Sequence, residues 1–151
     1  MILSTIAFVY APLALVPIIM IMLLVAIIPM IFFILTLQKA LNRCSPENRA
    51  MPPENVWLLL IPLFNLVWMF IVVNNMARSL AQEFKKREMT IEEIEPGKSI
   101  GLAYCILAVC SVIPFLGILS GLAAFVCWIM YWVKIDGYSS RLLYQELPPA
   151  R

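Results

Sequence analysis

The sequence predicts an all-α integral membrane protein: a bundle of three spanning helices plus a proline-interrupted fourth segment, either re-entrant or kinked. Of its 151 residues, 63% are hydrophobic and the mean hydropathy is +0.93, whereas soluble domains are roughly 45–50% apolar. The few charges are segregated, and none occurs in residues 1–38, 55–77 or 99–133. Each of these runs exceeds the ~20 residues that cross about 30 Å of hydrocarbon. The chain, residues 1–151, is therefore predicted to form a single membrane domain.

The first apolar run is predicted to be a retained membrane segment, because it has no basic start and is far longer than a cleavable signal. As one helix it would be about 57 Å long, too long for a bilayer. Pro12 and Pro17 are expected to divide it. The spanning helix is then predicted at about residues 14–40, with a kink at Pro29, and residues 1–11 form a separate apolar segment.

A turn-rich loop, residues 39–55, leads to the fourth segment, residues 54–77, which Pro62 and Asn65 interrupt. Two interpretations remain open: one kinked spanning helix, or a dip into the membrane that turns back at these residues. The excess of Lys and Arg in cytoplasmic loops favours the dip, because every basic residue then lies on one side. Length opposes it, since the arm before Pro62 reaches only ~15 Å into the bilayer.

Beyond residue 77 the pattern becomes amphipathic, which predicts a surface helix to about residue 88 followed by a linker at 89–98. The mixed charges of this region are typical of a solvated connector. The last apolar run predicts a helical hairpin over residues 99–134 that turns at Pro114 and Gly117. A polar tail, residues 135–151, follows.

The two proline turns resemble each other in sequence. Residues 61–65 and 113–117 each consist of Ile-Pro, two bulky apolar residues, and then Asn65 or Gly117. Asparagine and glycine adopt the left-handed conformation most readily, so they are expected to take it here. Asn65 is accordingly predicted to be a turn or packing residue rather than a ligand.

Small residues at four-residue spacing predict close helix packing in the last hairpin. Gly97 and Gly101 form one such pair, and Gly117 and Gly121 form another. Within one chain they most simply pack the hairpin on itself. Oligomerisation or partner binding is the alternative use of the same faces.

The residue types argue against catalysis and against a bound cofactor. The chain has no histidine, and its four cysteines form no C-x-x-C pair, so zinc and haem sites are not expected. Cys105, Cys110 and Cys127 lie in apolar helices and are interpreted as packing residues. No Asp, Glu, His, Lys or Arg lies in the apolar runs to relay protons. A net charge of +2 is too small to predict a nucleic-acid partner.

The chain resembles a family of small bacterial multi-pass membrane proteins that is known only as a domain of unknown function. The resemblance rests on the KALN sequence at Lys39–Asn42, on Trp57-x-x-x-Ile61-Pro62-x-x-Asn65, and on the helix ending at Arg78-Ser79-Leu80. These motifs cover roughly a quarter of the chain. The resemblance implies a bacterial inner-membrane origin and supplies no activity or binding residue.

Together these features predict a non-catalytic accessory, scaffolding or assembly subunit of a larger membrane complex. Its expected partners are membrane lipids and other membrane subunits or copies of itself. The alternative is a channel or carrier for a small neutral or lipidic solute, lined by Asn65, Asn74 and Asn75. The charge bias predicts a cytoplasmic C-terminus and an N-terminus outside.

Overall fold

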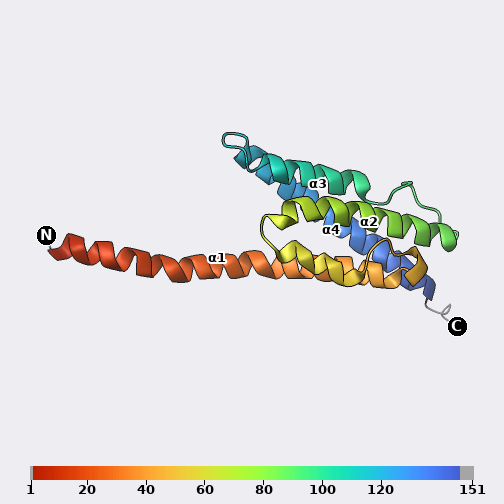
Figure 1. The fold of residues 1–151 in the computed structure, drawn as a ribbon, viewed down its shortest axis with the longest axis horizontal. Coiled ribbons are helices and arrows are strands. Elements are labelled where there is room, and N and C mark those ends of the chain that lie inside the picture. The colour runs from red at the N-terminus through yellow and green to blue at the C-terminus, as the bar shows by residue number, and fades with distance from the viewer. Residues whose placement is uncertain (1, 147–151) are drawn as a thin grey trace. The chain divides into compact units, whose positions relative to one another are not determined.

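All regular structure in the computed structural model, which describes residues 2–146, is helical (Figure 1). The chain divides between Phe33 and Ile34 into two compact units. The elements in order are α1 Ile2–Arg43, η1 Pro46–Asn48, η2 Pro53–Leu60, α2 Phe64–Lys86, α3 Lys98–Cys110 and α4 Gly117–Glu146, where η marks a 3-10 helix. The prediction of an all-α protein is confirmed for these residues.

Helix α1 runs without a break from Ile2 to Arg43. The sequence predicted a division at Pro12 and Pro17, and the structure instead continues the helix through both. A proline removes only one backbone hydrogen bond and clashes locally, and the long apolar runs on either side supply many intact bonds. Between residues 15 and 28 the large apolar side chains that the structure describes are 44–68% exposed and face every direction around the helix. The described side chains of this part of α1 therefore form no buried stripe.

In the part of the chain that the structure describes, two helices are long and apolar enough to cross a membrane, by length and composition: Leu15–Arg43 and Gly117–Gln145. Three such helices were predicted. Helix α3 is apolar but has only 13 residues, or about 20 Å of helix. Helix α4 continues to Glu146, so the predicted polar tail is helical over residues 135–146.

The fourth segment is a hairpin rather than one kinked helix. The 3-10 helix η2 ends at Leu60, the chain reverses over residues 61–63, and α2 begins at Phe64. Trp68 Nε1 donates to the Asn55 carbonyl oxygen at 2.9 Å, which joins the two arms. In a continuous helix residues 13 positions apart would be about 20 Å apart along the axis. The chain thus has the reversal that the re-entrant interpretation requires.

The two proline turns do share a geometry, but the left-handed residue is not the predicted one. Leu63 (φ 64°) and Phe115 (φ 73°) have positive φ, and each directly follows a proline. At the first turn the Phe64 N–H donates to the Pro62 carbonyl oxygen at 2.7 Å. That bond closes a three-residue γ-turn, which puts the positive φ on its central residue. Asn65 and Gly117 lie inside the first turns of α2 and α4 instead.

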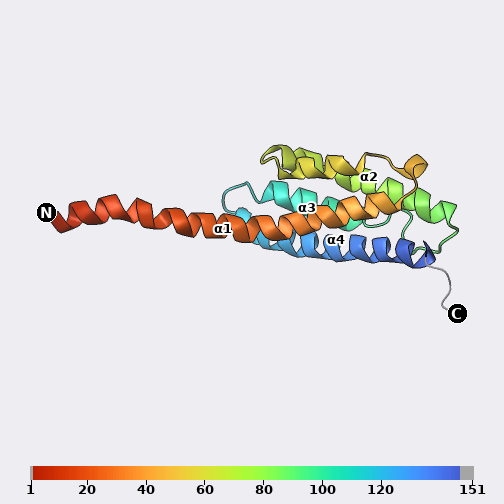
Figure 2. The ribbon, with the colours of Figure 1, turned by 90° about the horizontal axis from the view of Figure 1, so that it is seen from below.

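Both turns lie at one end of residues 34–146, opposite the loop that follows α1 (Figures 1 and 2). Leu63 is 84% exposed, and the exposure of Phe115 exceeds that of a fully extended reference. Two apolar tips therefore project at one end. The charged loops gather at the other end.

The core of residues 34–146 forms where the end of α1, α2, α3 and α4 meet. Its fully buried side chains include Ile34, Leu37, Leu41, Val72, Met76, Leu80, Ile135 and Leu142. Helix α3 approaches its neighbours most closely at Gly101. A Cβ there would lie 2.6 Å from Val73 Cγ1 on α2 and 2.9 Å from Tyr131 Cε2 on α4. A Cβ at Gly121 would meet only Ser111 Cβ, at an ordinary 3.8 Å.

Replacing Gly101 by alanine should destabilise the fold by roughly 1–3 kcal/mol, because the new methyl group overlaps two buried side chains. The valine involved is stiff at χ1 and has little freedom to move aside. Gly121→Ala is the matched control and should be neutral or slightly stabilising, since alanine favours helix. Thermal unfolding in detergent, followed by circular dichroism, measures both. Equal midpoints for the two variants would contradict this packing.

Candidate functional site

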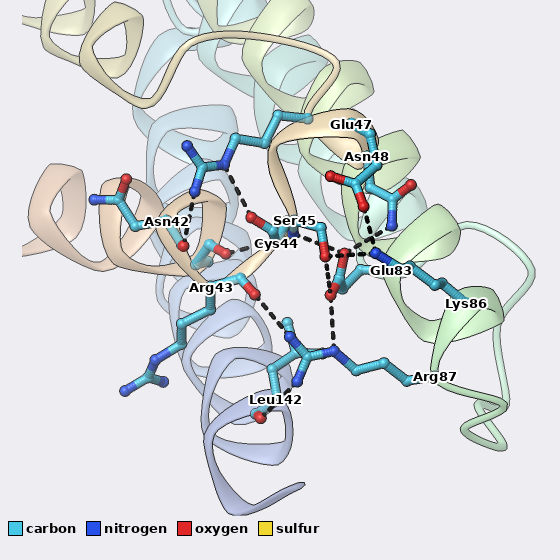
Figure 3. Close-up of polar contacts among 12 residues, drawn as sticks. Asn42, Arg43, Cys44, Ser45, Glu47, Asn48, Glu83, Lys86, Arg87 and Leu142 are labelled. Carbon is cyan, nitrogen blue, oxygen red and sulfur yellow. Dashed lines mark hydrogen bonds and ion pairs between the residues drawn. The ribbon is translucent and has the colours of Figure 1, made fainter. Parts of the chain in front are cut away.

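A buried carboxylate on α2 is the centre of the polar network at the charged end of residues 34–146 (Figure 3). The Glu83 side chain is only 1% exposed. It accepts hydrogen bonds from Ser45 N (2.8 Å), Asn48 Nδ2 (2.8 Å) and Arg87 Nε (2.7 Å). Ser45 Oγ adds a further bond at 3.1 Å. Both carboxylate oxygens are therefore satisfied by protein groups.

Local sequence explains how these donors reach Glu83. Glu83 and Arg87 are four positions apart on α2, so their side chains meet on one face of the helix. Ser45 precedes the short helix η1, whose first residue is a proline, and its backbone N–H is left for a side-chain acceptor. The loop after α1 thus covers a carboxylate that α2 presents from its buried face.

Arg87 extends this network to the ends of two further helices. Its Nη2 donates to the Arg43 carbonyl oxygen at 3.0 Å, and its Nη1 donates to the Leu142 carbonyl oxygen at 3.1 Å. Arg43 is the last residue of α1, and Leu142 lies near the end of α4. One guanidinium therefore joins α1, α2 and α4.

A second arginine completes the cap of α1. Arg49 Nη2 donates to the Asn42 carbonyl oxygen at 2.9 Å, and Arg49 Nε donates to the Cys44 carbonyl oxygen at 2.9 Å (Figure 3). The last carbonyl groups of a helix have no partner within it, and a cation there also complements the helix dipole. The polar network therefore satisfies the exposed backbone at the end of the most apolar helix.

The environment keeps Glu83 ionised. Burial by itself raises the pKa of its carboxyl, but the hydrogen bonds from Asn48, Ser45 and Arg87 outweigh burial and lower the pKa to about 2. Nearby, burial and then the charge of Glu83 raise the pKa of the Cys44 thiol to about 12. Cys44 is therefore a protonated thiol at neutral pH and a poor nucleophile.

A second polar cluster attaches the linker to α3 and α4. Glu93 Oε2 accepts a hydrogen bond from the Gly97 N–H at 2.8 Å, at the start of α3. The same carboxylate pairs with Lys134 and lies 3.4 Å from the Tyr138 hydroxyl oxygen. The Lys134 hydrogen bond, followed by that from Gly97, lowers the pKa of Glu93. Gly97 has φ +74°, a conformation that favours glycine, so the turn depends on this residue.

Both clusters hold structural elements together, and their donors and acceptors are occupied by one another. Within the described part of the chain, no three His, Cys, Asp or Glu side chains are grouped so as to hold a metal ion. The arrangement is therefore that of a clamp: it fixes the loops, α2 and the end of α4 by charge-assisted bonds.

Of the three asparagines of the predicted polar lining, Asn74 and Asn75 are neighbours on α2, and Asn65 lies at the start of that helix. Asn65 borders a small pocket of about 20 Å³ beside α3. Asn74 Nδ2 donates to the Phe70 carbonyl oxygen at 2.9 Å, and the Asn75 carbonyl oxygen accepts from Ser79 Oγ at 2.8 Å. Residues 65 and 74 differ by nine positions, which places them on roughly opposite faces of α2. Asn65 and Asn74 therefore do not share a helix face, and the polar lining by the three asparagines stays a prediction.

Sequence reasoning missed Glu83 and Arg87, because it treated the charges at 78–98 as a solvated connector. The sequence did contain a feature that indicates a buried carboxylate. The positions of Leu80, Glu83 and Phe84 lie on one side of an ideal helix, so the acidic residue falls on the apolar face. A carboxylate on a buried face requires a partner, and the arginine four positions later supplies it.

Comparison with protein-family models, characterised proteins and solved structures found no match to this chain.

The stability contributed by Glu83 should be lost in acid. Its folded pKa of about 2 lies below the ordinary value of 4.5, so the contribution is complete above pH 4.5 and disappears as pH falls toward 2. Chemical unfolding in detergent of the wild type and of Glu83→Gln should differ by about 3 kcal/mol at pH 7 and much less near pH 2. The exposed Glu54→Gln is the control and should show little difference. A constant gap between wild type and Glu83→Gln at every pH would refute a role for the charge.

Proposed function

We propose that this chain is a non-catalytic integral membrane protein that acts as an accessory, scaffolding or assembly subunit of a larger membrane complex. The supporting observation is the length of α1. The helix is continuous from Ile2 to Arg43, and its sequence is apolar and uncharged as far as Gln38. That apolar stretch is about 56 Å long. A bilayer offers only about 30 Å of hydrocarbon.

Tilting α1 in the membrane does not bring the whole apolar stretch within the hydrocarbon. Even at ~40°, the largest common tilt, the stretch would still extend roughly 43 Å along the bilayer normal. With Lys39 at one surface, about twenty residues fill the hydrocarbon and the apolar residues before about position 18 extend beyond it. An apolar helix outside the lipid core needs another apolar surface to cover it. A partner subunit, or a second copy of this chain, provides such a surface.

The polar clamps fit a structural role. Glu83 and Arg87 connect α1, α2 and α4, and Glu93 connects the linker to α4. These contacts, at the charged ends of the helices, fix the relative positions of their uncharged apolar stretches. A rigid, largely apolar body is suited to packing against other membrane helices.

We further propose a bacterial inner-membrane topology in which α1 and α4 span, α3 (13 residues) together with the apolar turn that follows it makes the third crossing, and the η2–α2 hairpin is re-entrant. The charged ends of the elements gather together, and the uncharged turns at residues 61–63 and 113–116 project at the other end. Every Lys and Arg then lies on the cytoplasmic side with the C-terminus, while the N-terminus lies outside. Re-entrant backbone requires cover by protein, and the packing of η2 against α2 supplies part of it.

Site-specific photo-crosslinking in native membranes tests the proposed partner. A photoreactive residue replacing Leu15, where the apolar helix exceeds the bilayer, should give a discrete protein adduct. The same residue replacing Val25, which is 65% exposed and lies in the middle of the span, is the control and should react mainly with lipid. Absence of any protein adduct from position 15, together with purification as a lone monomer, would overturn the proposal.

Thiol labelling with an impermeant reagent tests the topology. In a cysteine-free background, Glu47→Cys, Glu88→Cys and Glu146→Cys should all label from the cytoplasmic side, because both hairpins return to it. Ser4→Cys should label from the opposite side. Labelling of position 47 from the side opposite to position 88 would mean that the fourth segment crosses the membrane once.

A further inference from the structure

Two concavities meet on the surface of α4 at the boundary between its apolar and polar parts. One is a polar pocket of about 230 Å³ lined by Glu92, Lys134, Gly137, Tyr138 and Arg141. The other is an apolar groove of about 470 Å³ lined by Ile100, Ile129, Met130, Val133 and Lys134. Lys134 belongs to both. It is also the first charged residue after the apolar run 99–133.

Helix geometry makes the two concavities one continuous track. Met130, Lys134, Tyr138 and Arg141 follow one another at intervals of four, four and three residues, so they form one stripe along α4. Ile100 on α3 borders the apolar part, and Glu92 in the linker borders the polar part. The track therefore changes from apolar to charged at the position where a spanning helix would leave the hydrocarbon.

The polar pocket presents charges of both signs. Lys134 is held by its ion pair with Glu93. Glu92 and Arg141 are both exposed. An arginine is well suited to a phosphate group, since its planar guanidinium can donate two parallel hydrogen bonds. A carboxylate beside it suits an ammonium group. Gly137 leaves open space between them, with nothing within 4 Å of the position its Cβ would occupy.

From this arrangement we propose that the track binds one phospholipid with a phosphoethanolamine headgroup, a proposal that depends on the proposed membrane location. Arg141 binds the phosphate, and the Lys134 ammonium, which stays paired with Glu93, adds positive charge beside it. Glu92 binds the primary ammonium. One acyl chain lies in the groove along Ile100, Met130 and Val133. A free phosphate compound would use the charged pocket alone, and the adjoining apolar groove is the reason for assigning a lipid.

Native mass spectrometry of the purified full-length chain in detergent tests the site. The protein is titrated with phosphatidylethanolamine and, separately, with phosphatidylglycerol of the same acyl chains, which has the phosphate but no ammonium. The wild type should retain one phosphatidylethanolamine in preference to phosphatidylglycerol. Arg141→Gln should weaken binding of both lipids roughly tenfold, since it removes a charge-assisted contact to phosphate.

Glu92→Gln distinguishes the headgroup contacts. It should bind phosphatidylglycerol as the wild type does and lose the preference for phosphatidylethanolamine. Arg78→Gln is the matched control, because Arg78 is an exposed arginine on α2 outside both concavities, and it should bind as the wild type does. Gly137→Leu should reduce binding by filling the pocket. Because Glu92, Arg141 and Gly137 are all exposed, these substitutions should leave the fold intact.

Equal binding of the two lipids by the wild type, or equal binding by Arg141→Gln and Arg78→Gln, would overturn the proposal in favour of nonspecific surface lipid. The result is independent of the proposed partner, because the measurement uses the purified chain alone. A protein adduct from position 15 without a retained lipid would leave the subunit role standing and remove the lipid site.

Discussion

A carboxylate enclosed by protein keeps its charge only if hydrogen bonds replace the water it has lost. Glu83 meets this condition through the loop after α1 and through Arg87 on its own helix. Because Arg87 also donates to carbonyl groups near the ends of α1 and α4, the same pair sets how three helices end beside one another. The apolar contacts farther along these helices are non-directional. The directional hydrogen bonds of Glu83 and Arg87 therefore fix the relative placement of the helix ends, which apolar contacts alone leave open.

The distribution of polar groups follows from this arrangement. Charged side chains gather where the helices end and the loops need hydrogen-bond partners, and the opposite turns contain only uncharged residues. Glu93 is a smaller example of a carboxylate that joins several elements. It accepts a hydrogen bond from the Gly97 N–H at the start of α3 and pairs with Lys134 on α4. Between the two ends, close approach depends on Gly101, where α2, α3 and α4 leave no room for a Cβ.

Composition and hydropathy were sufficient to predict an all-helical protein and the hairpin of the last apolar run, because both depend on long apolar stretches and on proline. They were not sufficient for finer features. The positive φ falls on Leu63 and Phe115 rather than on Asn65 and Gly117. At Leu63 the hydrogen bond from Phe64 N–H to the Pro62 carbonyl oxygen, not residue preference, decides which residue is central in the turn. The continuity of α1 and the Glu83 network were also missed. The first depends on how many bonds a proline leaves intact, and the second depends on a loop that folds over a helix from 38 positions away.

The two turn tips have one further consequence. A left-handed conformation costs a non-glycine residue roughly 1–2 kcal/mol, so glycine would relax the backbone at positions 63 and 115. Leucine and phenylalanine stand there instead, with their side chains pointing outward. In water nothing offsets that strain. Transfer of such a side chain into hydrocarbon is worth about 1.5–3 kcal/mol, enough to make the strained tip the more favourable choice. Leucine and phenylalanine at these two positions are therefore the choice expected if the turns lie in hydrocarbon, as in the proposed topology.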